Sequence, residues 1–386
     1  MKSVDQPPAV RIGFFEAMQA LLTSLALNID IQHLRRRMLR FGVLYLRRPR
    51  QPDLANSKPI PRSGIYRILL CRPNHRLGNL LLLTPLLVEL QRSFPGTQVD
   101  LVVGGNQAAS LFKAFPNVGN VFRLPRHALR EPLRFIRVLR ALRRERYDLA
   151  IDPDVQSMSS RLLVDRCRAS YRIGFTGAKP ARGLSRAMQT PVVERHMGQL
   201  PVLLLRWAVE LPDGAIRYRV PALDLQLTAD EREWGRRRLA ELLQHEHGAA
   251  NGEVVAIFTH ATGAKRYSDS WWQDMLASLR HQYPESRFIE ILPAHARSSF
   301  AGAIPGYFST TPRRMAAIIA ATQLFLTADC GVMHLACAAR GPAVVGLFSC
   351  TDPAVYGPYG GSNHAFSTAG LAPAELCRQI GESIAR

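Results

Sequence analysis

The sequence predicts an α/β protein with two Rossmann-like halves that face each other across a cleft, preceded by an extra N-terminal helical segment. Two observations support this fold class. Short apolar strands alternate with helices from about residue 65 onward, and a second alternating series follows from about residue 253. The chain has 386 residues, of which 47% are hydrophobic, so it can bury two cores of ordinary size.

Residues 1–60 stand apart from this alternation. The apolar run Ile12 to Ile29 contains Glu16 and other polar residues, and it is too short and too polar to span a bilayer comfortably. No small-residue cleavage site precedes the following arginines, which argues against a secretory signal. The next segment, IDIQHLRRRMLRFGVLYLRRPR, has a basic amphipathic pattern. We therefore expect residues 11–50 either to contact an anionic membrane surface or to pack on the protein itself, before the linker PRQPDLANSKPIPRSG.

The first alternating series is interpreted as a domain that covers residues 61–215. Its expected strands are Arg67–Cys71, Gln98–Val103, Asn120–Leu124, Leu149–Asp152 and Tyr171–Gly174. Helices are expected to begin near Asn79, Gln107, Glu131 and Ser157. The first of these helices is expected to run without a break through Leu80, Leu83, Leu86, Leu87 and Leu90. Such an order predicts a parallel sheet with helices on both faces.

The second series is interpreted as a domain that covers residues 216–386. Its expected strands are Glu253–Phe258, Arg287–Leu292, Gln323–Leu326 and Pro342–Phe348. Helices are expected near Thr228, Asp269, Pro312, Val332 and Ala372. The two halves join near residues 212–226, so a ligand cleft is expected between them.

Composition narrows the function less than the motifs do. Fifty Lys and Arg against thirty Asp and Glu give a net charge of +20, which favours phosphates, nucleic acid or an anionic leaflet as partners. Nucleic acid is disfavoured because no basic stretch is interleaved with aromatic residues. The six cysteines form no C-x-x-C pair, which predicts reduced thiols, no metal site and a cytoplasmic location. Neither half contains G-x-G-x-x-G or a P-loop.

The most specific motif is LFLTADCGVMHLACAARGPAVVGLFSCTDPAVYGP, residues 324–358. A strand ends before a tight turn, and a helix starts by Val332 to His334. The backbone amides near Cys330 and Gly331 would then be available to a phosphate at the helix N-terminus. Asp329 could cap the helix or accept hydrogen bonds from sugar hydroxyls.

A second motif is VAIFTHATGAKRYSDSWWQDML, residues 255–276. A strand runs into a polar loop, and the following helix carries two tryptophans. Thr262 and Gly263 offer a hydroxyl and an exposed amide to a diphosphate, and Lys265 supplies a compact positive charge. Lys265 is the only lysine after residue 179 in an arginine-dominated chain, which favours a ligand role over a chance surface position.

Over residues 65–386 the sequence resembles glycosyltransferase family 9, the ADP-heptose:lipopolysaccharide heptosyltransferases. The segment TADCGVMHLACAARGPAVVGLFSCTDPAVYGP is similar to the family pattern D-S-G-x-M-H-L-A-x-A-x-G-x-P followed by T-D-P. The segment RLGNLLLLTPLLVELQRSFPGTQVDLVVG is similar to the family opening, and YDLAID and YRIGF match further family segments. The resemblance implies the GT-B fold.

The resemblance also implies an inverting, metal-independent transfer with no cofactor beyond a nucleotide-sugar co-substrate such as ADP-heptose. The donor-binding residues it implies lie in the C-terminal half: Thr262, Lys265, Asp329, Gly331 and His334. The backbone amides of Gly263 and Cys330 complete the candidate donor site. The acceptor, a saccharide or glycolipid, would lie against the N-terminal half. There Arg72 and Arg76 are candidates for binding an anionic acceptor.

The sequence departs from the family where an inverting transfer needs a base to take the acceptor proton. The family has an aspartate after L-G, and here that position is Asn79, whose amide can orient a hydroxyl but cannot deprotonate it. Three hypotheses remain open. His75, with an ordinary pKa of about 6.5, is the base; Asp152 or Asp154 at the end of the fourth strand is the base; or the protein only binds its ligands.

The sequence therefore predicts a cytoplasmic glycosyltransferase, peripheral on the inner face of the inner membrane, that moves a sugar to a lipopolysaccharide core or another surface glycan. Two alternatives share the same scaffold. The enzyme uses another nucleotide sugar or a protein acceptor, or it is an inactive nucleotide-sugar-binding homologue because Asn79 replaces the aspartate.

Overall fold

The computed structural model describes residues 58–126, 131–179, 181, 183–191, 195–210, 219–244 and 252–384. The chain divides into two compact units, Met1–Gln51 and Pro52–Arg386, and all described residues belong to the second. The predicted amphipathic helices and membrane contact of residues 11–50 therefore lie outside the described residues. Within the described ranges, no helix combines the length and the apolar character needed to cross a membrane.

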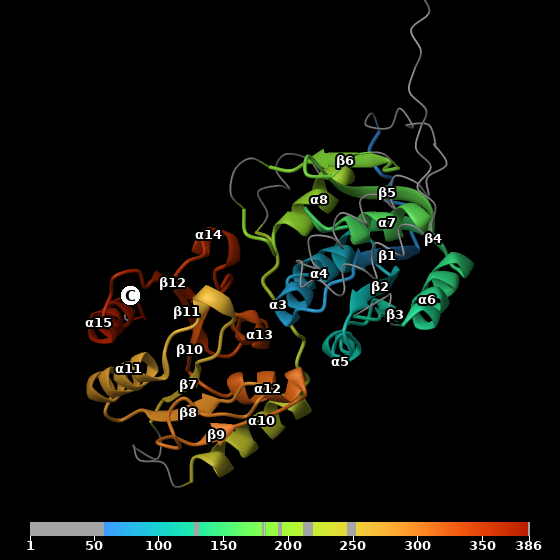
Figure 1. The fold of residues 1–386 in the computed structure, drawn as a ribbon. Helices are drawn as coiled ribbons and strands as arrows, with labels where there is room; N and C mark the ends of the chain where they lie inside the picture. Colours follow the sequence, from blue (N-terminus) through green and yellow to red (C-terminus); the bar gives the residue numbers. More distant parts are fainter. Residues whose placement is uncertain are drawn as a thin grey trace, which may run out of the picture. The chain divides into compact units, whose positions relative to one another are not determined.

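The first sheet has six parallel strands in the order β3-β2-β1-β4-β5-β6 (Figure 1). Its strands are β1 Arg67–Arg72, β2 Gln98–Gly104, β3 Val118–Leu124, β4 Arg146–Asp152, β5 Arg168–Thr176 and β6 Arg186–Gln189. The helices of this half are α3 Leu77–Leu81, α4 Thr84–Ser93, α5 Ala108–Phe112, α6 Pro132–Arg144, α7 Met158–Arg166 and α8 Leu200–Ala208.

The second sheet also has six parallel strands, in the order β12-β11-β10-β7-β8-β9. Its strands are β7 Val254–Phe258, β8 Arg287–Ile291, β9 Gly306–Tyr307, β10 Leu324–Ala328, β11 Ala343–Phe348 and β12 His364–Ser367. The helices are α10 Ala229–Leu242, η1 Gly263–Lys265 (a single 3-10 turn), α11 Asp269–Gln282, α12 Pro312–Ile319, α13 Gly331–Ala339, α14 Pro353–Tyr356 and α15 Pro373–Ile384.

Both sheets have one topology. Numbered within its own half, each sheet reads 3-2-1-4-5-6, the doubly wound order. The strand order reverses between β1 and β4 in the first sheet and between β7 and β10 in the second. Ligands of such sheets bind at the carboxyl ends of the strands beside this reversal. We call the two places the first and the second switch point, and the predicted α/β fold with two Rossmann-like, GT-B-like sheets is confirmed.

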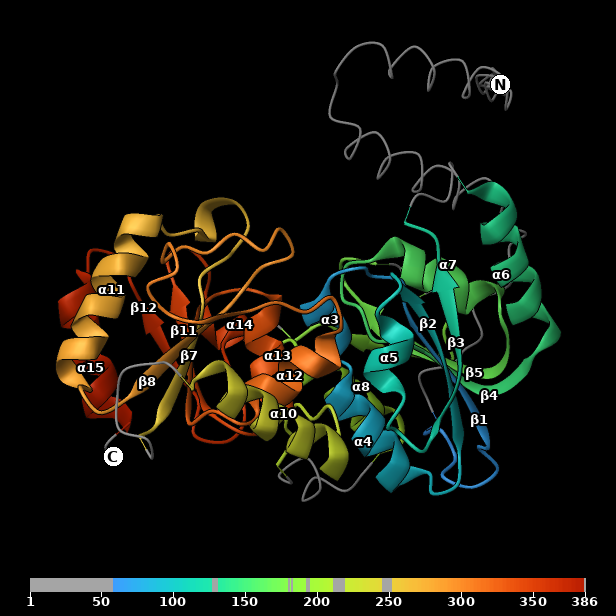
Figure 2. The same ribbon diagram turned by 90° about the horizontal axis from the view of Figure 1, so that it is seen from below.

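Successive side chains of a strand point to opposite faces of its sheet, and different helices cover the two faces. In β7, Val255 and Ile257 join one core cluster with α11 and α15, whereas Ala256 and Phe258 join another with α12 and α13. Figure 2 shows α11 and α15 side by side over one face of the second sheet. The cluster that contains Ala256 is continuous with residues of α4 and α8 from the first half.

The structure differs from the predicted elements in two respects. Strands β6, β9 and β12 were not predicted, because each has only two to four residues and carries no apolar run. The single leucine-rich helix expected from Asn79 onward is wrong, because α3 ends at Leu81 and α4 begins at Thr84. Pro85 has no N–H for the carbonyl of Leu81, and the Thr84 hydroxyl donates to that carbonyl instead (2.8 Å).

Candidate functional site

The second switch point is built around Asp329, which follows β10. Its Oδ2 accepts from the Lys265 ammonium (2.5 Å) and from the Thr351 hydroxyl (2.5 Å). The side chain of Asp329 is 6% exposed, whereas that of Lys265 is 31% exposed. Lys265 therefore neutralises a nearly buried carboxylate while its own charge still reaches solvent. Thr351 belongs to the T-D-P segment of the sequence, in which no role was predicted for this hydroxyl.

Helix α13 begins directly beside this ion pair. Cys330 is its N-cap residue and makes no side-chain capping hydrogen bond. The carboxylate of Asp329 is bound to Lys265 and Thr351, so the capping alternative for this residue is not what the structure shows. A helix of nine residues thus starts at Gly331 next to a solvent-accessible ammonium, and both features attract an anion.

The loop that carries Lys265 is open on its outer side. Thr262 and Gly263 are exposed, and Gly263 has a φ of 65° with no atom within 4 Å of the place where a Cβ would lie. The Ser349 hydroxyl holds the loop by donating to the Ala264 carbonyl (3.2 Å). The Lys265 Nζ also lies 5.9 Å from the ring centroid of Tyr356. The structure thus brings Thr262, Gly263 and Lys265 onto one accessible turn.

His334 lies in the first turn of α13 and is 5% exposed. Burial is the main reason that its pKa falls to about 4, and the nearby His196 and Lys265 lower it further. The imidazole is therefore neutral at pH 7, and its Nδ1 is buried without a hydrogen-bond partner. His196, which sequence reasoning missed, lies 6.4 Å away between ring centroids and bonds through Nε2 to the Gly357 carbonyl (2.8 Å).

The opening loop of the first half meets this helix at two glycines. A Cβ on Gly78 would lie 2.9 Å from Cδ2 of His334 and 3.2 Å from the Gly331 Cα. A Cβ on Gly331 would lie 3.0 Å from the Gly78 nitrogen. Helix α3, which contains the half-buried Asn79, therefore packs against α13 at its first turn. The position that replaces the family's aspartate is thereby brought close to His334.

The first switch point holds Asp152, the last residue of β4. Its carboxylate accepts from the Ser160 hydroxyl (2.6 Å), the Arg161 Nε (2.9 Å) and the Lys179 Nζ (2.6 Å). Asp152 and Lys179 are both 0% exposed. A carboxylate enclosed in this way offers no accessible lone pair to an acceptor hydroxyl, so the geometry favours a structural role for Asp152 over the base hypothesis.

Asp154 and His75 both lie at the carboxyl edge of the first sheet, on opposite sides of the end of β1. Asp154 is half-buried, and its Oδ1 accepts from the backbone amides of Gln156 (2.8 Å) and Ser157 (2.6 Å). His75 is exposed and its ring lies against Gly104, where a Cβ would be 2.6 Å from Nδ1. Both side chains are at the carboxyl edge of the first sheet, as predicted from their positions after strands.

Arg72 is the last residue of β1 and lies between these two groups. It is 2% exposed, and its Nε and Nη1 are buried without a hydrogen-bond partner. Burial lowers the pKa of its guanidinium, while Asp154, Asp152 and Tyr356 act in the opposite direction. A buried guanidinium with two unsatisfied donors is costly unless an anion completes it. Arg76, in contrast, is exposed.

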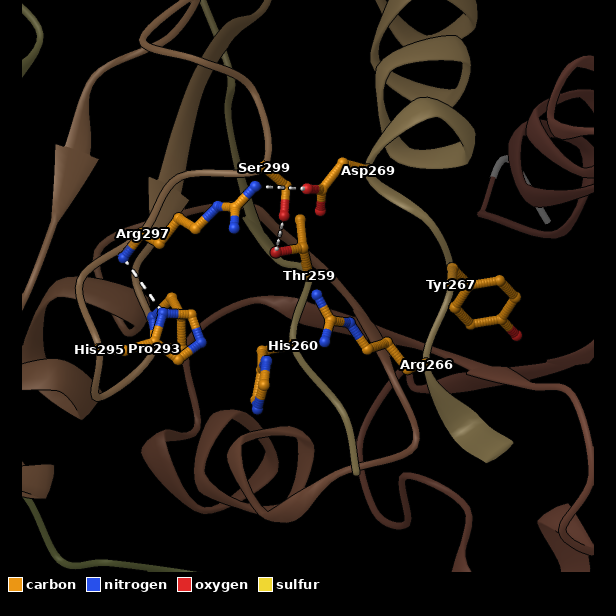
Figure 3. Close-up of a pocket in the computed structure, with 9 residues that line it drawn as sticks. All are labelled: Thr259, His260, Arg266, Tyr267, Asp269, Pro293, His295, Arg297 and Ser299. Carbon is orange, nitrogen blue, oxygen red and sulfur yellow. Dashed lines mark hydrogen bonds and ion pairs between the residues drawn. The ribbon is translucent and has the colours of Figure 1, made fainter. Parts of the chain in front are cut away.

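A basic pocket lies at the carboxyl ends of β7 and β8 (Figure 3). The side chains that line it are Thr259, His260, Arg266, Tyr267, Asp269, Pro293, His295, Arg297 and Ser299. The rings of His260 and His295 are perpendicular at 5.0 Å, and Arg297 lies 3.6 Å from Asp269. Burial, then His295 and Arg266, lowers the pKa of His260.

Sequence reasoning missed this pocket, because it assigned no role to the segment PAHARSS after β8. The signal that could have found it is the run of histidine and arginine directly after a central strand of a doubly wound sheet.

The fold is that of a two-sheet, GT-B-like protein, and the comparison with protein families adds the enzyme class, a glycosyltransferase. The model of glycosyltransferase family 9 (heptosyltransferase) matches residues 309–381, which contain Asp329, Gly331 and His334. The resemblance predicted from the sequence is thereby confirmed, and so is the enzyme class. No protein with a curated description matches the chain.

Solved structures show the same fold at low identity. A family 9 glycosyltransferase from Veillonella parvula has a TM-score of 0.64 at 15% identity, over 87% of this chain and 91% of its own. E. coli heptosyltransferase WaaC, solved with ADP, has a TM-score of 0.62 at 18% identity, over 82% and 99%. E. coli ADP-heptose lps heptosyltransferase II has a TM-score of 0.62 at 16% identity, over 83% and 98%.

Proposed function

We propose that this protein is an inverting, metal-independent glycosyltransferase that transfers heptose from ADP-heptose to a lipopolysaccharide core or another surface-glycan acceptor. The observation that carries the proposal is the cluster of Lys265, Asp329 and Thr351 at the start of α13. Asp329 and Thr351 lie within the segment matched by the family 9 model, and Lys265, outside that segment, bonds to Asp329. Two structures with this fold, E. coli WaaC with ADP and E. coli ADP-heptose lps heptosyltransferase II, support the choice of donor.

In this proposal the donor diphosphate lies against Thr262, Gly263 and Lys265, with the first amides of α13 on its other side. Lys265 and the helix dipole stabilise the negative charge that grows on the departing nucleoside diphosphate. Asp329, held in place by Thr351, accepts hydrogen bonds from sugar hydroxyls. Neutral His334 offers its unpartnered Nδ1 to the donor. The pocket lined by His260 and Arg266 receives the nucleoside, since Arg266 directly follows Lys265 in the chain.

The acceptor lies at the first switch point. Arg72 and Arg76 bind its anionic groups, and the two unsatisfied donors of Arg72 are the observation that supports this. Asn79 orients the reacting hydroxyl, and His75 or Asp154 takes its proton. Because such acceptors are built on the inner membrane, we place the enzyme on its cytoplasmic face.

A thermal-shift panel of nucleotide sugars tests the donor. We expect ADP-heptose to raise the melting temperature of the wild-type protein and UDP- and GDP-sugars to leave it unchanged, because only a bound ligand stabilises the folded state. The shift should be lost in Lys265→Ala and kept in Arg236→Ala, a change on the exposed side of α10. A larger shift with a UDP- or GDP-sugar would contradict the proposed donor and favour another sugar on the same scaffold.

A second hypothesis is that the protein is an inactive homologue that only binds the nucleotide sugar, because Asn79 lacks a basic lone pair. It predicts that the wild-type protein binds the donor without turnover and that Asn79→Asp creates transfer activity. The proposed function predicts measurable transfer by the wild type. Donor hydrolysis and transfer assays on both proteins therefore separate the two hypotheses.

A further inference from the structure

Helix α6, which joins β3 to β4, has an outer face that nothing in the described structure covers. Leu133 is 70% exposed and Ile136 is 41% exposed, and both belong to the short set of large exposed hydrophobic side chains. The opposite face packs in the core cluster of this half through Phe135, Val138 and Leu142. The helix is therefore anchored, and its two apolar side chains point outward from a fixed element.

All charged side chains of this helix are positive. Residues 132–144 contain no acidic residue and five arginines: Arg134, Arg137, Arg140, Arg143 and Arg144. Arg134 pairs with the preceding Glu131 (3.0 Å). Within the described ranges the other four form no salt bridge. No acidic side chain of the described residues therefore neutralises their charge.

Helix α10 provides an internal comparison, since it is also exposed and rich in arginine. It has four arginines and four acidic residues, and its arginines pair along the helix, Arg236 with Glu233 (2.6 Å) and Arg238 with Glu241 (2.7 Å). No large hydrophobic side chain of α10 is exposed. The arginine-rich helix α10 thus differs from α6 in two features: its arginines are paired, and it exposes no large hydrophobic side chain.

The position of α6 follows from the topology. The helix leaves the carboxyl end of β3 and returns to the start of β4, which is parallel to it, so its N-terminal end lies at the carboxyl edge of the first sheet. Leu133 and Ile136 are in this end of the helix. The same edge holds Arg72, His75 and Asp154, the groups assigned to the acceptor.

We propose that the outer face of α6 docks on an anionic lipid bilayer. Leu133 and Ile136 enter the boundary between headgroups and acyl chains, and the unpaired arginines contact the lipid phosphates, which is the pattern of an interfacial helix. The docked surface presents a lipid-linked acceptor to the edge that holds Arg72. This inference rests on the proposed function for its purpose, but its test measures lipid contact and not sugar transfer.

Hydrogen exchange of the full-length wild-type protein tests the contact site directly. Vesicles of phosphatidylcholine mixed with equal moles of phosphatidylglycerol should slow exchange in residues 131–144 and leave α10 unchanged, and pure phosphatidylcholine vesicles should slow neither. If the protein binds the anionic vesicles without any change in residues 131–144, as it would through residues 11–50 alone, the proposal is overturned. Equal protection of α10 would overturn it as well.

Vesicle co-sedimentation of variants provides the second measurement. Leu133→Gln combined with Ile136→Gln should lower the partition coefficient on anionic vesicles by about tenfold, and Arg137→Gln and Arg140→Gln by roughly fivefold each. The matched control is Arg236→Gln with Arg237→Gln on α10, which should change it by less than about twofold. Circular dichroism verifies that each variant is folded. Unchanged partitioning of folded α6 variants contradicts the proposal, whether or not the enzyme transfers a sugar.

Discussion

The two switch points share a topology and a pair of side chains, yet they differ in exposure. In the first, Asp152 at the end of β4 pairs with Lys179 at 2.6 Å; in the second, Asp329 after β10 pairs with Lys265 at 2.5 Å. The first pair is fully buried and is completed by Arg161, whereas Lys265 remains about one-third exposed. The same lysine–carboxylate pair is therefore enclosed in one half and accessible to solvent in the other, where we propose that it faces the ligand.

This difference shows why strand position alone does not identify a catalytic carboxylate. The end of the fourth strand is a favoured place for function in both sheets. Burial and the number of bonds already made decide whether the group can still act on a ligand. Asp152 already accepts three side-chain hydrogen bonds, so it stabilises its own half of the protein.

The largest expected effect is on stability at the first switch point. Asp152→Ala leaves Arg161 and Lys179 buried without their carboxylate, and breaking such a pair costs about 3–5 kcal/mol of the free energy of unfolding. Urea denaturation measures this loss. Asp329→Ala is the matched control and should cost less than about 1 kcal/mol, because Lys265 can be solvated. Equal losses in the two variants would remove the distinction between the switch points.

The next effect is on catalysis at the second switch point. Lys265→Ala should lower kcat/KM for transfer from ADP-heptose by about 10²–10³-fold, because the charge that stabilises the leaving diphosphate is lost. Steady-state transfer kinetics measure it. Lys113→Ala is the control, since Lys113 also pairs with a carboxylate, Glu231 at 3.0 Å, but lies outside both switch points. Full turnover by both Lys265→Ala and Asp329→Ala would rule out the donor site.

His334 gives the second switch point a pH dependence. Its pKa is about 4 in the folded protein, against about 6.5 when unfolded, so the unfolded chain binds the proton more tightly. Stability is therefore fully present above pH 6.5 and is lost as the pH falls toward 4. Between pH 7.5 and pH 5 the loss is about 2 kcal/mol. His334→Gln should flatten this part of the stability profile, and an unchanged slope would show that other groups cause it.

The smallest effect contrasts two buried arginines of the first half. Arg72→Met removes a guanidinium with two unsatisfied donors and should leave the free protein as stable as the wild type or about 1 kcal/mol more stable. The same change should raise KM for an anionic acceptor and leave KM for the donor unchanged. Arg161→Met removes a partner of Asp152 and should destabilise. A destabilised Arg72→Met variant would show that Arg72 is already satisfied in the free protein.

The sequence predicted the alternation of strands and helices well, because buried parallel strands such as β1 and β10 are apolar runs with polar residues at their ends. Helix starts were also well placed where a capping side chain marks them. Ser157, Thr228 and Ser268 each accept a hydrogen bond from the backbone three residues later. Edge strands such as β6 and β12 were missed, because each has only four residues and no run of buried apolar side chains.

The candidate site was predicted only in part, and the reason is long-range contact. Local pattern placed Asp329 and Lys265 after strands, but not their pairing across 64 residues. It also ranked Asp152 with Asp154 as a base, since the enclosure of Asp152 depends on Lys179, which is 27 residues away. The unsatisfied state of Arg72 and the packing of His334 against Gly78 are likewise properties of the assembled fold.

Gly78 and Gly331 bring two backbone segments that are distant in the sequence so close together that one added methyl group does not fit between them. A single added carbon at either glycine is a spacer that forces the starts of α3 and α13 apart, because backbone atoms or a buried ring occupy the place it needs. Gly78→Ala and Gly331→Ala are thus tools for holding the two switch points at a greater separation without altering any charged group. Distance between donor and acceptor could then be varied independently of the chemistry at either one.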